Sequence, residues 1–570
     1  MVKKEKLLIL IPIFSLALSV FSAGLILYFI LKYGVDVPYN DQWNYAEFFV
    51  HYFDGTLTFE ELFRLQNEYR QFFPNIIFLG LGLLTDWNVK YEMLVVFLLA
   101  CLTSYNILRL SFFTLKGNKW INWVLFFIAN LFIFSPMQYE NWLFGVQIQY
   151  LLPMACISSC LLLALTKTNK YVALIVCILL SLISSYSTPN GFLCWLLTFP
   201  VLLIRSPKKS FFRKWPVVLI WLMGIALTLF FYFFDYKNPP DYPSTYSIFE
   251  HPIDAIRYYF ALLGNPIRIV HSLQHITAVG GVVCFIFILI LTYLFYHRKD
   301  KLLIQNSIVW LMLATYSLVS AGLVTIGRLG FGLYQSLSSR YTSYTLYLIV
   351  AGIFLLALII RHNKINTRFV IYRNIFLAIF IVYIISVKID TYPVAVSDLK
   401  IFHSRIQHGK AGLLFINHFP HQECENKIYP YNPRQLWCWA NLLNDLGYLR
   451  PALLKTDVIQ DIEGEESGEV AYGSLDKIER LQGNEFKAYG TAMMPDNKRP
   501  ADAVLLSFDN YEGKSLLLDL YNGDSINWTK TFSLGMVPYD TVTISAWAFD
   551  ANNAKAYRLH GNYKLAKIVY

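Results

Sequence analysis

Long apolar runs recur along most of the chain, and they constrain the fold more than any other feature of the sequence. Between residues 7 and 390 these runs repeatedly approach the ~20 residues that an α-helix needs to cross a bilayer. Hydrophobic residues make up 56% of the chain and charged residues only 15%, against roughly 25% in soluble domains. A water-soluble fold cannot bury so much apolar surface, whereas helices satisfy their own backbone hydrogen bonds in lipid. The sequence therefore predicts an all-α polytopic membrane domain.

Lys and Arg gather in short connectors between the apolar runs. The positive-inside rule places such connectors in the cytoplasm. The basic connectors are residues 3–6, 116–119, 167–170, 205–214, 297–301 and 361–373. Eleven spans satisfy them together, namely 7–31, 89–112, 120–136, 147–166, 170–187, 190–205, 215–234, 276–296, 304–327, 340–361 and 372–390. The net charge of +10 is thus a topology signal, and no nucleic-acid partner is expected.

This topology has consequences for the outer face of the membrane. The apolar segment 72–85 is short for a crossing, and we expect it to lie along the outer surface as a helix. An odd number of spans gives a cytoplasmic N-terminus and a C-terminal domain on the outer side of a plasma (inner) membrane. The polar connectors on the outer side are 32–70, 136–147, 187–190, 235–275 and 327–339. A chemical site is therefore expected to face outward.

The composition divides the chain into three regions. Residues 1–390 form the membrane domain with an outer loop at 32–86, and residues 391–467 form a mixed α/β connector with an amphipathic helix at 437–446. In residues 468–570, short alternating runs separated by turn residues predict a β-sandwich, a candidate carbohydrate-binding domain. Trp528 and Trp547 are either stacking platforms for sugars or core aromatics, and the core is favoured for Trp547.

Cysteine and histidine residues give few further signals. Cys424 and Cys438 lie in the outer region, where a disulfide bridge and two unpaired thiols are equally compatible with the sequence. His251, His271 and His275 share an outer loop without the spacing of a zinc site, so no metal is assigned to them.

The first outer loop carries the strongest functional signal. Asp36, Asp41 and Glu47 directly follow the first span, and Glu68 and Arg70 return charge to the same surface. Ionised groups close to lipid are costly, so they indicate a functional site. The alternative is that Asp36 or Asp41 only caps a helix.

Two motifs of this loop resemble the glycosyltransferase C superfamily, which includes protein O-mannosyltransferases, aminoarabinose transferases and oligosaccharyltransferases. Asp41-Gln-Trp-Asn-Tyr-Ala46 is similar to the Asp-Glu-x-x-Tyr-Ala-like stretch after the first span of those enzymes, with Gln42 where Glu is frequent. Glu68-Tyr-Arg-Gln-Phe-Phe-Pro74 occupies the place of their Lys-Pro-Pro-like motif. Motif detail covers about the first 110 residues. The resemblance implies a membrane enzyme that takes sugar from a lipid carrier.

The chemistry of such a transfer assigns expected roles. A carboxylate must take the proton of the acceptor hydroxyl, and Asp41 is the expected base. Asp36 is the alternative base, or a helper that positions Asp41 or a divalent cation such as Mg²⁺ or Mn²⁺. The charge of the leaving phosphate needs cations, for which Arg70, Arg328 and Arg340 are the candidates. Arg340 alternatively snorkels to lipid phosphate.

Trp43, Glu68 and Glu140 are the candidate contacts to acceptor or sugar. For the surroundings of Glu140, an interfacial aromatic belt formed by Tyr139 and Trp142 is an equal explanation.

The sequence thus predicts a membrane glycosyltransferase that moves sugar from a polyprenyl-phosphate donor to a cell-envelope glycan, lipid or protein. One alternative is a transporter or flippase of lipid-linked glycans, but the spans show neither internal repeats nor many charges. The other is a non-catalytic glycan-binding assembly protein, which the terminal β region favours.

Overall fold

The fold was analysed in a computed structural model. The structure describes residues 2–66, 68–117, 119–204, 211–237, 244–268, 272–362, 367–465, 472–494, 499–523 and 525–568. The chain divides into two compact units. The first unit comprises Met1–Gly34, Leu57–Phe78 and Lys90–Leu399, and the second comprises Val35–Thr56, Leu79–Val89 and Lys400–Tyr570.

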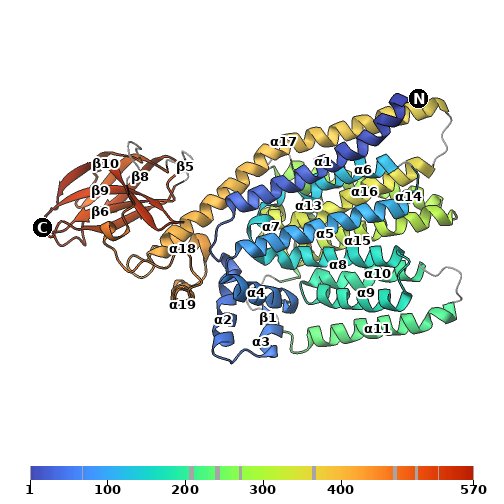
Figure 1. Cartoon of the computed structure of the whole chain (residues 1–570), viewed down its shortest axis with the longest axis horizontal. Helices are drawn as coiled ribbons and strands as arrows, with labels where there is room; N and C mark the ends of the chain where they lie inside the picture. The colour runs from blue at the N-terminus through green and yellow to red at the C-terminus, as the bar shows by residue number, and fades with distance from the viewer. Residues whose placement is uncertain are drawn as a thin grey trace. The chain divides into compact units, whose positions relative to one another are not determined.

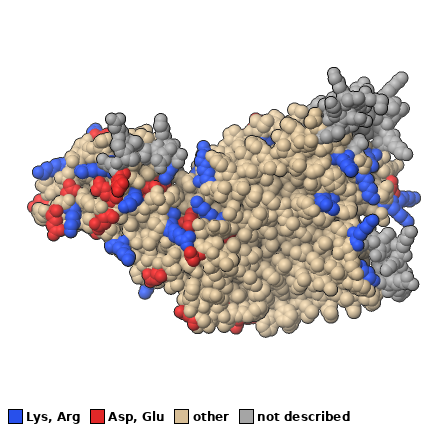
Figure 2. Space-filling model, viewed as in Figure 1, with Lys and Arg blue, Asp and Glu red and all other residues tan. Residues whose placement is uncertain are grey.

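The first unit is a bundle of long helices (Figure 1). Its principal helices are α1 (Val2–Tyr33), α5 (Lys90–Thr114), α6 (Lys119–Ile133), α8 (Ile148–Leu165), α9 (Lys170–Ser185), α10 (Leu193–Ile204), α11 (Phe211–Phe233), α13 (Pro252–Gly264), α14 (Leu273–Tyr296), α15 (Lys301–Arg328), α16 (Thr342–His362) and α17 (Thr367–Leu414). Large apolar side chains such as Phe230 and Phe285 are exposed on its flank. Figure 2 shows that the visible flank carries almost no charge, and that Lys and Arg gather at the end where the N-terminus lies.

Eight helices of the described chain are long and apolar enough to cross a membrane, which is compatible with a multi-pass membrane protein. They are Leu10–Tyr33, Lys90–Thr114, Lys119–Leu143, Gly145–Leu165, Trp215–Phe233, Leu273–Tyr296, Lys301–Phe331 and Ser339–His362. The predicted spans 170–187 and 190–205 correspond to the shorter apolar helices Lys170–Ser185 and Pro189–Leu203. The predicted count of eleven is therefore confirmed only in part. Segment 72–85 forms helix α4 (Phe72–Thr85), as predicted.

Contacts sort the connectors of the first unit into two groups. Three predicted cytoplasmic connectors meet, because the Arg361 guanidinium packs against Gly117 and the His362 imidazole lies 3.1 Å from the Asp300 carboxylate. The predicted outer connectors also contact one another. Their links are the Tyr236 hydroxyl to Glu68 O, Asn265 to Ser338 O, Glu140 to Ser339 and Glu68 to Arg328.

Helix α17 continues past the end of the predicted last span. It runs for 48 residues through Pro393 to Leu414, and the first unit ends inside it at Leu399. At 1.5 Å per residue the helix is about 72 Å long. The predicted last span and the polar segment after it thus lie in one helix, whereas the change in composition near residue 390 suggested a boundary.

The β region of the second unit differs from the predicted sandwich. Its main strands are β3 (Gly473–Arg480), β4 (Glu485–Met494), β6 (Ala503–Asp509), β7 (Ser515–Tyr521), β8 (Asn527–Ser533), β9 (Thr541–Asp550) and β10 (Lys555–Ala566), with the short β5 (Arg499–Pro500). They form one eight-stranded sheet in the order β5-β4-β3-β10-β9-β6-β7, with β8 paired to β4. The sheet is a half-barrel instead of two separate layers. The turn residues 495–498, which supported the sandwich, lie outside the described residues.

A bulge in β10 explains the single sheet. The register of β10 against β9 shifts between Arg558 and Asn562, and Gly561 lies there with φ +91°. A bulge bends its strand, and at this bend His560 of β10 pairs with Ser474 of β3. That pairing joins the two halves of the sheet around one apolar core that includes Leu506, Trp528 and Ile544.

The predicted amphipathic helix is confirmed as α19 (Pro433–Asp445). The Asn432 side chain accepts hydrogen bonds from the backbone N–H groups of Arg434 and Gln435 and thereby caps its N-terminus. Leu436, Ala440 and Leu443 form its buried face.

Candidate functional site

A short hairpin in the first outer loop positions two of the predicted site residues, Glu68 and Arg70, with Tyr69 between them. Strands β1 (Leu65–Gln66) and β2 (Tyr69–Arg70) pair antiparallel, and Glu68 lies in the turn between them. Successive side chains of a strand point to opposite faces. Tyr69 and Arg70 therefore point in opposite directions, and each contacts a different part of the first unit.

Arg70 anchors the hairpin to the end of α11. It donates from Nε to the Tyr232 carbonyl at 2.7 Å and from Nη1 to the Phe63 carbonyl at 2.9 Å, and Nη2 donates to the Phe234 carbonyl. All three guanidinium nitrogens thus meet backbone oxygens. The sequence assigned Arg70 to the donor phosphate, but the structure gives it this anchoring role.

Arg328, in the last turn of α15, makes an ion pair with the carboxylate of Glu68. The same nitrogen, Nη2, lies 2.6 Å from the Tyr69 hydroxyl. Burial raises the pKa of Tyr69 well above its usual value, and the charge of Arg328 opposes this shift. Tyr69 is therefore a neutral hydroxyl at physiological pH, and it makes a hydrogen bond to the Glu68 side chain. Glu68, a predicted sugar contact, instead neutralises Arg328.

Arg340 is held by its backbone. Glu140 Oε2 accepts hydrogen bonds from the hydroxyls of Ser338 at 2.9 Å and Ser339 at 2.7 Å, and from the Arg340 backbone N–H at 3.0 Å. The Asn141 amide donates to the Arg340 carbonyl. Glu140, another predicted contact to acceptor or sugar, thus fixes the segment that leads into α16.

The Arg340 guanidinium is different from those of Arg70 and Arg328. Among the residues that the structure describes, no carboxylate or carbonyl accepts a hydrogen bond from it, and its Nε is buried without a partner. It lies over the ring of Tyr341, with the guanidinium carbon 5.2 Å from the ring centroid. When no protein acceptor bonds to a guanidinium, its N–H groups are available to an anionic ligand.

Several tyrosines interact with the two arginines. Tyr150 of α8 and Tyr258 of α13 interact electrostatically with both Arg328 and Arg340, as does Tyr69 with Arg328. Tyr258 is fully buried, and its hydroxyl has no hydrogen-bond partner in the described part of the chain. We call Arg328, Arg340, Tyr69, Tyr150, Tyr258 and Tyr341 the arginine–tyrosine cluster. All six belong to the first unit.

The sequence did not single out these tyrosines. The chain has 39 tyrosines, and an apolar run containing Tyr150 or Tyr258 looks like any other membrane helix. The one available signal was Tyr69, which stands between two residues that were already candidates.

Asp36, Asp41 and Trp43 belong to the second unit. Asp36 Oδ1 accepts a hydrogen bond from the Val89 backbone N–H at 3.1 Å, directly before α5. Asp41 lies half-buried in the first turn of a 3₁₀ helix, η1 (Asn40–Tyr45). Trp43 is fully buried. Its ring therefore has no open face on which a sugar could stack.

The charge of Asp41 affects the pKa of Tyr429. Burial raises this pKa first, and the negative charges of Asp41 and Glu47 raise it further. The Asp41 carboxylate thus lies close to a tyrosine hydroxyl within the second unit.

The described residues contain no group of three or more His, Cys, Asp or Glu side chains arranged to hold a metal ion. His271 lies outside the described residues. Asp36 and Asp41 alone make a sparse ligand set for Mg²⁺ or Mn²⁺.

The tryptophans of the β region are core residues. Trp528 and Trp547 are 3% and 2% exposed, and the Trp547 indole N–H donates to the Ser507 hydroxyl at 2.8 Å. The stacking-platform interpretation is therefore wrong for both rings. Cys424 is buried and Cys438 exposed, and both are free thiols in the structure.

No family model, no curated protein and no solved structure matches the chain.

Proposed function

We propose that the protein is a membrane glycosyltransferase that moves a sugar from a polyprenyl-phosphate donor to a cell-envelope glycan, lipid or protein on the outer face of the membrane. The observation that carries this proposal is the Arg340 guanidinium, which has no acceptor in the described chain and lies among tyrosine hydroxyls. Guanidinium and hydroxyl donors together are suited to phosphate.

In the proposed reaction the cluster binds the phosphate of the donor. Arg340 supplies a charge that no carboxylate among the described residues pairs with, and the Tyr258 hydroxyl, which has no partner there, supplies a neutral donor. Arg328 is neutralised by Glu68 and holds Tyr69 in place. As the bond from the anomeric carbon to the phosphate oxygen breaks, negative charge grows on the phosphate, and fixed donors stabilise it.

The acceptor side of the reaction is assigned to Asp41. The acceptor hydroxyl attacks the anomeric carbon, its proton moves to the Asp41 carboxylate, and the lipid phosphate leaves as an anion. This role rests on the position of Asp41 in the first outer loop and on its resemblance to the motif of glycosyltransferase C enzymes.

The proposal is tested by incubating the purified protein with a polyprenyl-phosphate sugar labelled in the sugar and an envelope extract as acceptor. We expect release of lipid phosphate and a labelled product. Arg340→Gln should reduce the rate about 10–100-fold, because a hydrogen bond to a charged group contributes about 1.5–3 kcal/mol. Arg340→Lys should recover part of it, since a lysine keeps the charge but not the planar fork.

Arg257→Gln is the matched control, because Arg257 is an exposed arginine in a surface pair with Asp254. It should leave the rate unchanged. A donor that is bound but remains intact would contradict the enzyme and favour the transporter or the glycan-binding protein.

A further inference from the structure

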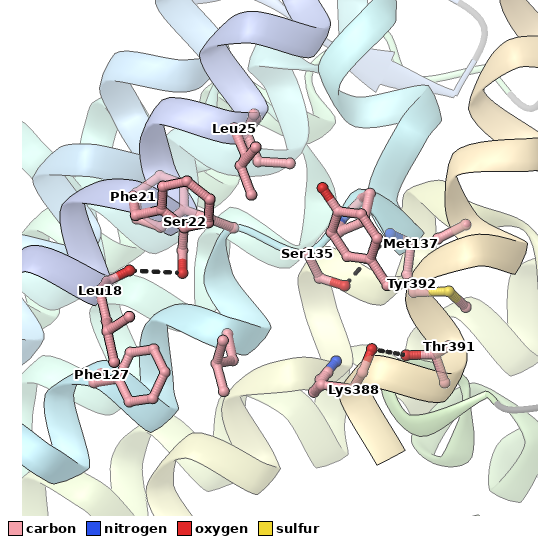
Figure 3. Close-up of a pocket in the computed structure, with 15 residues that line it drawn as sticks. Leu18, Phe21, Ser22, Leu25, Phe127, Ser135, Met137, Lys388, Thr391 and Tyr392 are labelled. Carbon is pink, nitrogen blue, oxygen red and sulfur yellow. Dashed lines mark hydrogen bonds between the residues drawn. The ribbon is translucent and has the colours of Figure 1, made fainter. Parts of the chain in front are cut away.

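A cavity of about 230 Å³ lies between α1, α6 and α17 in the first unit. Its apolar lining includes Leu18, Phe21 and Leu25 of α1 and Phe127 and Leu131 of α6. Figure 3 shows these α1 residues on one side, opposite Met137, Lys388 and Tyr392. Phe21 is 61% exposed, so the cavity opens on the flank that faces lipid.

The residues lining the cavity change from apolar to polar along the helix axes. Phe127 lies eight residues into α6, about 12 Å from its start, and α6 ends about 9 Å further on, two residues before Ser135. Lys388 lies about 32 Å along α17, close to the ~30 Å thickness of a hydrocarbon core. The polar side chains Ser135, Lys388 and Thr391 thus mark the end of the cavity at headgroup depth, and the apolar side chains lie deeper.

Lys388 is the only cation among the residues lining the cavity. Its ammonium group donates to the Pro266 carbonyl at 3.0 Å and lies 4.1 Å from the centroid of the Phe132 ring. No carboxylate of the described residues forms an ion pair with it. An ammonium group has three donors, so donors remain for an anion. At headgroup depth an ammonium group lies where the phosphates of anionic lipids are found.

We propose that this cavity binds an anionic phospholipid of the surrounding bilayer. One acyl chain lies along Leu18, Phe21 and Phe127, and the headgroup phosphate meets Lys388. The lateral opening at Phe21 provides an entry from the bilayer, and the single ammonium complements a single phosphate. No residue of the arginine–tyrosine cluster is among the residues that line the cavity. The site is therefore separate from the donor site, and it does not depend on the proposed function.

The test uses the full-length protein purified in detergent and native mass spectrometry with added phosphatidylglycerol or phosphatidylcholine. We expect phosphatidylglycerol to bind at least about tenfold more tightly than phosphatidylcholine. Lys388→Met should remove this preference. The control Lys400→Met, at an exposed lysine of the same helix, should keep it.

A second variant tests the chain-binding part. Ser22→Leu adds apolar volume on the α1 side of the cavity and suits a membrane helix, so it should fold and weaken binding of both lipids. Equal binding of phosphatidylglycerol by the wild type and Lys388→Met would overturn the proposal. Binding of inorganic phosphate as tight as that of the lipid, or selective binding of polyprenyl phosphate in its place, would also overturn it.

Discussion

At the residue scale, three arginines that look alike in the sequence have different functions in the structure. Arg70 donates to backbone carbonyls, Arg328 pairs with Glu68, and Arg340 has no acceptor in the described chain. Only a cation that no nearby acceptor occupies can bind a ligand without first losing a protein contact. The proposed phosphate contact therefore falls on Arg340, with Arg328 as a supporting residue.

Glu68→Gln tests the supporting role. Arg328 and Glu68 are 14% and 20% exposed, so the substitution leaves a mostly buried guanidinium without a counter-charge. We expect a loss of about 1–3 kcal/mol of stability, seen as a lower midpoint of thermal unfolding in detergent. Glu250→Gln, at an exposed position, should leave the midpoint unchanged. An unchanged midpoint in Glu68→Gln would show that the pair does not support the site.

Asp41→Asn tests the base. The amide keeps the shape of the side chain but cannot take a proton, so the transfer rate should fall by about 10²–10⁴ in a folded protein. Asp36→Asn should have a milder effect, because an amide oxygen also accepts the hydrogen bond from Val89 N–H. Initial rates with the labelled donor measure both. The opposite order of effects would exchange the two roles, and full activity in both variants would remove this loop from the mechanism.

At the scale of elements, α13 and α14 approach so closely that two glycines are required. A Cβ atom on Gly280 would lie 1.8 Å from the Phe260 carbonyl oxygen, and one on Gly264 would lie 2.1 Å from the Ile276 carbonyl oxygen. Small residues allow such contact between helices in lipid. The packing matters for the site, because α13 carries Tyr258.

Gly280→Ala should force α13 and α14 apart. We expect a loss of about 1–3 kcal/mol of stability and reduced activity through displacement of Tyr258. Gly281→Ala is a close control, since a methyl group at this next position along α14 would meet no other atom within 4 Å. Thermal unfolding and the transfer rate measure the effect. Equal behaviour of the two variants would contradict the close contact.

At the scale of the whole molecule, the topology remains a prediction that the grouping of connectors supports. We expect an impermeant maleimide to label Cys438 in intact cells, because Cys438 is exposed and residues beyond the last span are predicted outside. Cys438→Ser should abolish this labelling, since Cys424 is buried and the other six cysteines lie within apolar helices of the first unit, where a charged maleimide does not reach them. Labelling that requires permeabilised cells would invert the topology and place the proposed site in the cytoplasm.

The sequence by itself determined the features that depend on neighbouring residues. Apolar runs of membrane length, basic connectors and the amphipathic pattern of α19 are local, and the structure contains the corresponding helices. The run 72–85 was likewise predicted to be a helix and is one. Such signals are local because a helix satisfies its own backbone within one segment.

Only the tertiary structure decided which of the candidate residues have available donors. Arg70 meets Tyr232, 162 residues away, Arg328 meets Glu68 across 260 residues, and Glu140 holds Arg340 N–H across 200 residues. The same holds for the β region. The β3–β10 pairing joins the strands into one sheet where a sandwich was predicted, and Trp547, a candidate sugar platform, is buried and bonded to Ser507. An arginine or a tryptophan looks the same in the sequence whether or not a distant residue contacts it. Long-range packing decides whether that contact forms.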